Sequence, residues 1–294
     1  MSKFDLHIHT NHSSNSKLNI NEILDNCSEN NIDILSITDH DSCASFFDID
    51  PIKTSFKGKI IYGMEANAMI GKVTYDILCY DFDLEMVMEW SSKTYPPGGH
   101  HQEIIFNALR DLCIKNSILF DESLPYDSVN EYAHGAMLRM LQTTPESIKF
   151  LESYGIYNVT DFYHIGTVEE KFPLFVDMHI LWPDIEELKD VIHKAGGKIF
   201  LAHPFKCNRD VTEVLESCFP HVDGIEISNE PNSAEEVQML YDFAKDKKLL
   251  VSAGNDYRGS KKHNELGVKY LTNEMEEDIL SWVNNCQHYM TLPK

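Results

Sequence analysis

The segment Phe4–Thr10 constrains this chain most, because it places two histidines one residue apart in a short predicted strand. Side chains alternate between the two faces of a strand, so His7 and His9 point to one side while Leu6 and Ile8 point to the other. Two imidazoles in this arrangement can hold one metal ion. Fourteen histidines in 294 residues also produce close pairs by chance, so the pair alone leaves a plain polar strand end open.

Strand-like and helix-like segments alternate at both ends of the chain. Six further apolar runs are predicted strands, at residues 32–37, 59–65, 73–80, 198–202, 224–228 and 249–253. Helical segments lie between several of them, the first with Asn19 as N-cap and Glu22 as its capping-box partner, and the last with Asn273 as N-cap. The alternation predicts an α/β fold with a largely parallel sheet.

The middle of the chain has a different pattern. Residues 83–172 show helical spacing without strand alternation, and they include the loop Tyr95–Gly99. We therefore expect one α/β domain formed by residues 1–82 and 173–294, with residues 83–172 inserted as a helical cap subdomain.

Polar side chains follow the predicted strands where each strand ends. In chain order they are His7, His9, His40, Glu65, Asp76, His203 and Asp256. Imidazole and carboxylate are the usual ligands of zinc, manganese and iron, and no cysteine belongs to the set. Strand ends of an α/β fold meet at one rim, which predicts a catalytic metal site there. A carboxylate such as Glu65 could bridge two ions that clamp a phosphoryl group.

The formal net charge of −22 argues against affinity for a nucleic-acid backbone or an anionic membrane surface. It leaves a small phosphorylated substrate open, because bound metals reverse the local field. The seven cysteines include no C-x-x-C pair, which favours reduced thiols. With no signal-like segment and no membrane-length apolar run, we expect a cytoplasmic protein.

Five motifs in order resemble the PHP (polymerase and histidinol phosphatase) superfamily: D-L-H-I-H-T, I-T-D-H-D, G-M-E, L-A-H-P and G-N-D. The resemblance covers residues 3–82 and 180–270, and it is strongest to stand-alone bacterial phosphoesterases of small phosphorylated molecules, including nucleotides. It implies a distorted (β/α)7 TIM-like barrel with a helical insertion, and two or three divalent ions (Mn, Fe or Zn) at its C-terminal rim.

The resemblance also implies which residues bind metal. His7, His9, Glu65 and Asp256 would hold the first ion. Glu65 would bridge to a second ion, which His203 and Asp76 would complete. His40 would belong to a third ion.

Three positions depart from the family pattern. Ser14 stands near an expected aspartate, Asp76 replaces a histidine, and Arg258 replaces another histidine. A guanidinium does not bind metal but binds phosphate as a bidentate fork. We therefore expect a two-metal site in which Arg258 contacts the substrate phosphate and takes over the electrostatic role of the third ion. His40 is then a wall residue or a proton donor to the leaving group.

One further candidate lies in the insertion. His134, in A-H-G-A-M-L-R, loosely matches an R-P-H-x-A-R-A-L pattern of related phosphoesterases and is a candidate substrate contact. The sequence favours hydrolysis of a small phosphomonoester by a metal-activated water. Histidinol-phosphate hydrolysis and a metal-binding module that has lost activity are the alternatives. The acidic charge disfavours a polymeric nucleic-acid substrate.

Overall fold

The computed structural model describes residues 3–13, 16–96, 100–207, 209–230, 232–259 and 265–292. The chain divides into two compact units. The first contains Met1–Ile70, Tyr75–Lys93 and Pro183–Lys294, and the second contains Gly71–Thr74 and Thr94–Trp182. Most of the helix Leu84–Thr94, which lies in the segment predicted as an insertion, belongs to the first unit, and the second unit extends to Trp182.

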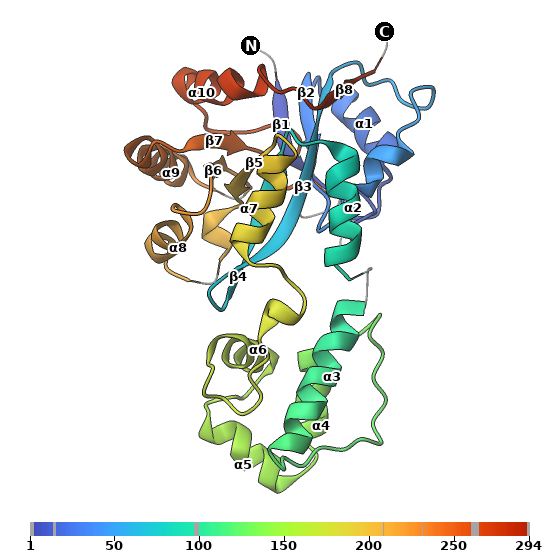
Figure 1. Ribbon diagram of the computed structural model, residues 1–294, viewed down its shortest axis with the longest axis vertical. Coiled ribbons are helices and arrows are strands. Elements are labelled where there is room, and N and C mark those ends of the chain that lie inside the picture. The colour runs from blue at the N-terminus through green and yellow to red at the C-terminus, as the bar shows by residue number, and fades with distance from the viewer. Residues whose placement is uncertain are drawn as a thin grey trace. The chain divides into compact units, whose positions relative to one another are not determined.

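Within the described residues, the first unit is built on an eight-stranded mixed sheet (Figure 1). Seven strands follow one another in chain order and β8 pairs with β3: β1 Phe4–Ile8, β2 Ile34–Ile37, β3 Lys59–Ile70, β4 Val73–Tyr80, β5 Lys198–Leu201, β6 Gly224–Ser228, β7 Leu250–Ala253 and β8 Tyr289–Thr291. The pairs β1–β2, β2–β3, β5–β6 and β6–β7 are parallel, whereas β4–β5 and β3–β8 are antiparallel. This confirms the predicted α/β class with a largely parallel sheet.

The two ends of the strand order are linked just beyond β7. The backbone N–H of His9 donates to the carbonyl of Tyr257 at 2.8 Å, and the N–H of Tyr257 donates to the carbonyl of His7 at 3.1 Å. Ile8 and Tyr257 form a parallel bridge. The segment that follows β7 therefore lies beside the end of β1, although the two are far apart in the sequence.

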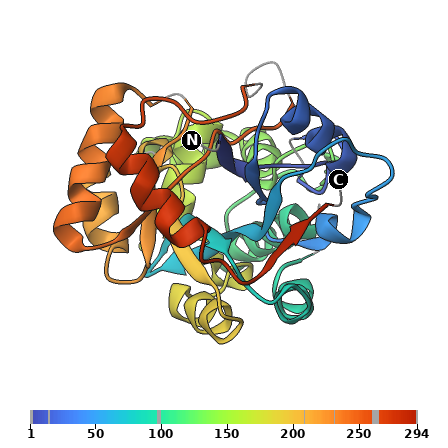
Figure 2. The same cartoon turned by 90° about the horizontal axis from the view of Figure 1, so that it is seen from above.

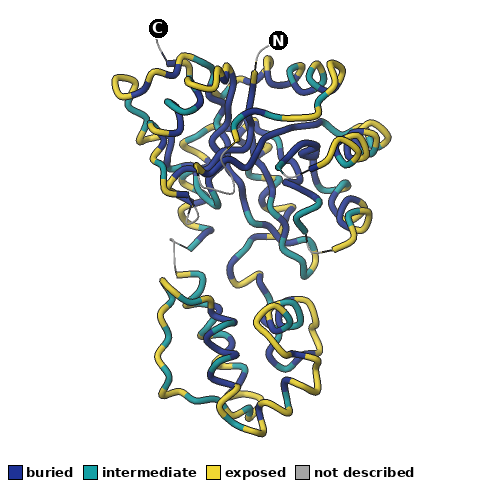
Figure 3. The backbone as a smooth tube through the Cα atoms, turned by 180° about the vertical axis from the view of Figure 1, so that it is seen from behind, coloured by how far each residue is buried: buried dark blue, intermediate teal, exposed yellow. Residues whose placement is uncertain are grey.

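Apart from the short strand β8, the strands of the first unit are mostly buried, and helices pack on several of them. Strands β1, β2 and β6 are buried along their whole length, as the dark tube in Figure 3 shows. Neither face of these strands is open to solvent, which is typical of parallel sheets. Helix α7 (Ile185–Lys194) packs on β5, α9 (Ala234–Lys247) on β6 and α10 (Asn273–Val283) on β7. Figure 2 shows α9 and α10 on the outside of the strands.

The remaining helices of the first unit are α1 (Ile20–Glu29), α2 (Leu84–Thr94) and α8 (Val211–Cys218). The predicted capping box of α1 is confirmed, because Asn19 accepts from the backbone of Glu22 and the Glu22 side chain accepts from the backbone of Asn19. An apolar stripe at helical spacing, from Ile20 to Cys27, is buried and fixes the face of α1 that points inward.

The second unit consists mainly of helices α3 (His100–Lys115), α4 (Ala133–Leu141), α5 (Pro145–Ser153) and α6 (Val159–Val168). Helix α4 packs against both α3 and α6. Across the residues that the model describes, no helix has the length and apolarity to cross a bilayer. All seven cysteines lie in described segments and are free thiols.

Candidate metal centre

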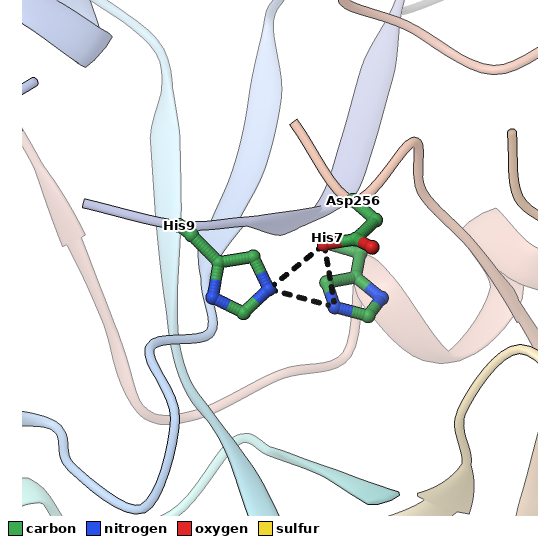
Figure 4. A group of neighbouring side chains, drawn as sticks. All are labelled: His7, His9 and Asp256. Atoms are coloured by element: carbon green, nitrogen blue, oxygen red, sulfur yellow. Dashed lines mark hydrogen bonds and ion pairs between the residues drawn. The ribbon is translucent and has the colours of Figure 1, made fainter. Parts of the chain in front are cut away.

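Three side chains from the two linked strand ends converge at one point. His7 lies in β1, His9 directly follows that strand, and Asp256 lies shortly after β7. The Nε2 atoms of the two histidines are 3.1 Å apart, and Oδ1 of Asp256 is 3.0 Å from Nε2 of His9 and 3.8 Å from Nε2 of His7. Figure 4 shows the three side chains directed toward one another. All three are buried, so they form a candidate ligand set for one ion.

Glu65 of β3 connects this set to two more. Its Oε1 is 3.3 Å from Nε2 of His7 and 2.9 Å from Nε2 of His203. Its Oε2 is 3.2 Å from Nε2 of His9 and 3.1 Å from Nδ1 of His40. Glu65 therefore belongs to two further groups of potential ligands, His7–Glu65–His203 and His9–His40–Glu65.

Asp76 of β4 lies at the margin of this cluster. Its Oδ2 is 3.7 Å from Nε2 of His203, and its side chain is 36% exposed. Within the described residues it joins none of the three compact ligand groups. The geometry thus brings five of the seven sequence-predicted ligands into buried contact and places His40 beside them, whereas Asp76 lies at the edge of the cluster, 3.7 Å from His203.

Two cationic side chains hold Asp256 from the other side. Nη2 of Arg258 is 2.6 Å from Oδ1 of Asp256, and Nη1 of Arg258 is 3.2 Å from Nε2 of His40. Nζ of Lys206 donates to Oδ2 of Asp256 at 2.8 Å. Sequence reasoning missed Lys206. Pro204 begins a tight turn in which the Lys206 N–H donates to the carbonyl of His203, and this turn places Lys206 beside the site.

The donor atoms fit divalent metals. They are imidazole nitrogens and carboxylate oxygens without sulfur, the set that suits zinc, manganese and iron. Oε2 of Glu65 is fully buried and has no hydrogen-bond partner among the residues that the structure describes. A buried carboxylate oxygen without such a partner is costly unless a cation faces it.

Glu226, from β6, supports two of the candidate ligands from behind. Its Oε1 is 2.9 Å from Nδ1 of His7, and its Oε2 accepts from the backbone N–H of His203 at 2.8 Å. A carboxylate on the far ring nitrogen makes Nδ1 the protonated one and leaves Nε2 free to bind metal. Sequence reasoning missed Glu226, because it lies inside a strand, G-I-E-I-S, and not at a strand end. A carboxylate in such an apolar strand is rarely buried without a partner, and this could have pointed to it.

His9 is oriented through a serine. Nδ1 of His9 lies 2.9 Å from Oγ of Ser13, which donates to Oδ1 of Asp39 at 2.7 Å. Asp39 also accepts from the N–H and the hydroxyl of Thr10, each at 2.7 Å. Asp39 therefore acts on a histidine indirectly and also fixes the backbone that follows β1.

Three residues at the site have a left-handed backbone. The φ angles are 56° at Asp41, 25° at His203 and 53° at Asp256. Such conformations are costly for residues other than glycine, and they persist where the surrounding structure imposes them. Two of the three, His203 and Asp256, are candidate metal ligands, so the backbone strain coincides with the candidate site.

The electrostatics of the cluster keep its carboxylates ionised. Burial alone would raise the pKa of Glu65, but the nearby His7 and His40 outweigh it and hold the pKa well below its usual range. The pKa of Asp256 is likewise lowered, since His9, His7 and Arg258 outweigh its burial. Burial together with the charge of Glu65 raises the pKa of Asp76, and the opposing effects of His203 and His7 offset this only in part.

The histidines of the cluster respond differently. Burial would lower the pKa of His7, but the carboxylates of Glu65 and Glu226 raise it well above its ordinary value. Burial lowers the pKa of His40 to about 3, with the charges of His9 and Arg258 adding to the effect. Nε2 of His40, 3.2 Å from Nη1 of Arg258, can accept from the guanidinium. The role of His40 as a wall residue or as a proton donor to the leaving group stays a prediction.

Two further positions from the sequence remain. Ser14 is outside the described residues. His134 belongs to α4 of the second unit, where it is buried against the rings of Phe162 and Tyr163. Burial lowers the pKa of His134 to about 4, and its Nε2 has no hydrogen-bond partner within the described part of the chain. Its role in substrate binding stays a prediction.

Similar proteins share the fold over nearly the whole chain. An amidohydrolase structure from Chromobacterium violaceum, with bound sulfate and no metal, covers 100% of this chain and 99% of its own, at a TM-score of 0.60 and 16% identity. A candidate metal-dependent phosphoesterase structure from Bifidobacterium adolescentis covers 95% of this chain and 96% of its own, at a TM-score of 0.56 and 20% identity.

A curated relative gives a similar result at the level of sequence. The 5′-3′ exoribonuclease of Haemophilus influenzae is 23% identical over 269 residues, which span 87% of this chain and 89% of the relative. The model of the PHP domain matches residues 5–201. That match includes His7, His9, His40, Glu65 and Asp76, and so the chain belongs to the PHP domain family.

Proposed function

We propose that this protein is a metal-dependent phosphoesterase that hydrolyses a small phosphomonoester. The observation that carries the proposal is the sharing of Glu65 between two compact ligand groups, with Arg258 and Lys206 beside them. Shared carboxylates hold paired metal ions in enzymes that cleave phosphate esters. Membership of the PHP domain family and the likeness to a candidate metal-dependent phosphoesterase support the same reaction class.

In this proposal the ligands divide as follows. His7, His9, Glu65 and Asp256 hold the first ion, and Glu65, His203 and Asp76 hold the second. Arg258 takes the position of a third ion, which is supported by its contacts with both Asp256 and His40. We also propose that the sheet closes as a distorted (β/α)7 barrel, which the bridge between Ile8 and Tyr257 supports.

Divalent ions in such a site supply a nucleophilic water at neutral pH and neutralise phosphoryl charge. The remaining tasks belong to the protein. Arg258, held by two partners, presents a fixed positive charge to the phosphoryl oxygens. Lys206 adds a second cation on the other oxygen of Asp256. Glu226 keeps the ring of His7 in one orientation.

The direct test combines metal analysis with a substrate screen. Protein purified without chelator is expected to contain two ions per chain and to hydrolyse phosphomonoesters when manganese is added. Glu65→Gln should lose both metal and activity, while Glu216→Gln, at an exposed pair with Lys247, should retain both. Three ions per chain would refute the assignment of Arg258. A folded, metal-loaded protein without turnover would favour the inactive metal-binding module.

A second candidate function is the release of nucleotides from the 5′ end of short RNA, which the named activity of the Haemophilus influenzae relative favours. Both reactions cleave a phosphate ester with the same residues. A 5′-phosphorylated oligoribonucleotide, a nucleoside monophosphate and histidinol phosphate, assayed side by side, separate the three activities. Release of mononucleotides from the oligonucleotide without hydrolysis of either monoester would select the nuclease.

A further inference from the structure

A hollow in the first unit, apart from the metal centre, lies at the ends of β6 and β7 and has a volume of about 200 Å³. Its floor includes three asparagines, Asn229, Asn232 and Asn255, each at most 8% exposed. Its lining also includes Glu230, Lys269 and Tyr270, and Tyr270 as a residue is 57% exposed. The hollow is therefore polar inside and open to solvent beside an aromatic ring.

Three buried polar atoms of the lining have no hydrogen-bond partner within the described ranges. They are Oδ1 of Asn229, Oε2 of Glu230 and Nδ2 of Asn232. The orientation of the Asn229 amide is fixed, because its Nδ2 donates to the carboxylate of Glu226 at 3.3 Å. Its oxygen is thus a buried acceptor on a residue that lines the hollow. Buried groups of this kind are costly unless a ligand or ordered water satisfies them.

The three atoms indicate which ligand would satisfy them. The oxygens of Asn229 and Glu230 each accept a hydrogen from the ligand, and the Asn232 nitrogen donates one to a lone pair of the ligand. Two adjacent hydroxyl groups supply both hydrogens and still accept the third bond. A fully ionised phosphate has no hydrogens for Asn229 and would meet the carboxylate of Glu230. A metal ion is disfavoured by the amide hydrogens of Asn232. The volume lies below the usual 300–1,000 Å³ of drug-sized pockets, as expected for one sugar ring.

We propose that this hollow binds the vicinal diol of a ribose, with the attached base free to stack on Tyr270. Carboxylate and amide groups that read ribose hydroxyls are a recurrent solution in nucleotide-binding proteins, and exposed tyrosine rings stack on bases. The hollow is separate from the metal centre, because Glu226 lies between them. Glu226 accepts from Asn229 on one side and faces Nδ1 of His7 on the other, whereas Nε2 of His7 is the candidate ligand atom.

Adenosine tests the proposal independently of the proposed hydrolysis, because it carries no phosphate. Titration of the full chain by calorimetry should show saturable adenosine binding, about tenfold weaker binding of 2′-deoxyadenosine, and a similar loss in Asn232→Ala. Glu230→Gln, at a partly exposed position, provides a second variant whose folding is checked by thermal melting and should lose affinity likewise. Arg258→Ala should bind adenosine as the wild type does.

The opposite results overturn the proposal. No saturable adenosine binding at millimolar concentration would mean that water alone satisfies the three atoms. Equal affinity for adenosine and 2′-deoxyadenosine would remove the diol from the recognition. Binding that survives both Asn232→Ala and Glu230→Gln but is lost in Arg258→Ala would place the nucleoside at the metal centre instead.

Discussion

The guanidinium of Arg258 joins Asp256 to His40, with its two terminal nitrogens 2.6 Å from Oδ1 of the aspartate and 3.2 Å from Nε2 of the histidine. Arg258 is 7% exposed, so its charge is enclosed with the carboxylates that it faces. Arginine keeps its charge at any working pH and holds a planar fork in place. It therefore provides a permanent positive charge between Asp256 and His40, both of which are potential metal ligands.

Replacing Arg258 with alanine should lower kcat/KM by about 10²- to 10³-fold, the usual cost of losing a fixed charge at a developing oxyanion. Arg258→Lys should recover only part of this loss: lysine restores the positive charge, but its ammonium cannot contact both Asp256 and His40 as the guanidinium does. Arg139→Ala is the matched control, since Arg139 pairs with Glu131 in the second unit. A wild-type kcat/KM in Arg258→Ala would contradict the role.

Glu226→Gln should weaken metal binding by about 10- to 100-fold, because the amide does not fix the ring of His7 as the carboxylate does. Titration against a chelator of known affinity measures the change. Glu216→Gln, an exposed substitution on α8, should leave metal affinity unchanged. If both variants bind metal equally well, Glu226 has no orienting role.

Removal of metal should lower the melting temperature. Without a cation, the buried carboxylates of Glu65 and Asp256 depend on histidines and Arg258 for their counter-charge. An ion that binds the folded chain alone adds about 2.7 kcal/mol at one hundred times its dissociation constant. Calorimetric melting with and without chelator tests this, and Glu65→Gln should show a much smaller chelator effect. An identical melting curve for the wild type in both conditions would count against a metal centre.

The second unit should lose stability in mild acid through His134. The imidazole has a pKa of about 4 when folded, against about 6.5 in an unfolded chain. The unfolded chain therefore binds the proton first, so stability is complete above about pH 6.5 and falls as the pH drops toward 4. The loss should reach about 3 kcal/mol at pH 4.

Hydrogen exchange of the amides in α4 and α6 measures that loss. His134→Phe has no group that titrates there, so protection in this variant should change little over the same pH range. Equal acid sensitivity in the two proteins would mean that other groups carry the effect.

Much of the α/β pattern could be predicted because the signals are local. The strands and the capping box of Asn19 and Glu22 depend on neighbouring residues. The same reasoning placed the last N-cap one residue late: Thr272 accepts from the backbone of Met275, so Asn273 is the first helical residue. Both residues are good N-caps, and tertiary packing decides between them. Strand β3 also continues past Glu65 to Ile70, because β4 pairs with it.

The candidate site was predictable in its ligands and less so in their surroundings. His7, His9 and Asp256 are polar residues at strand ends, where the fold gathers its functional groups. Glu226 and Lys206 were missed because each acts through a partner distant in the sequence: His7 for one and Asp256 for the other. Such a partner becomes visible only when the strands are arranged in space.

The pairing of the β1 end with the segment after β7 has a consequence for synthesis of the protein. His7 and His9 leave the ribosome early, whereas Asp256 and Tyr257 follow almost the whole of the chain. Domains fold as units while synthesis proceeds. The second unit, nearly continuous in sequence, can therefore fold on the ribosome. The group of His7, His9 and Asp256, by contrast, cannot assemble until residue 256 has been synthesised, so it joins the first and the late parts of the chain in time as well as in space.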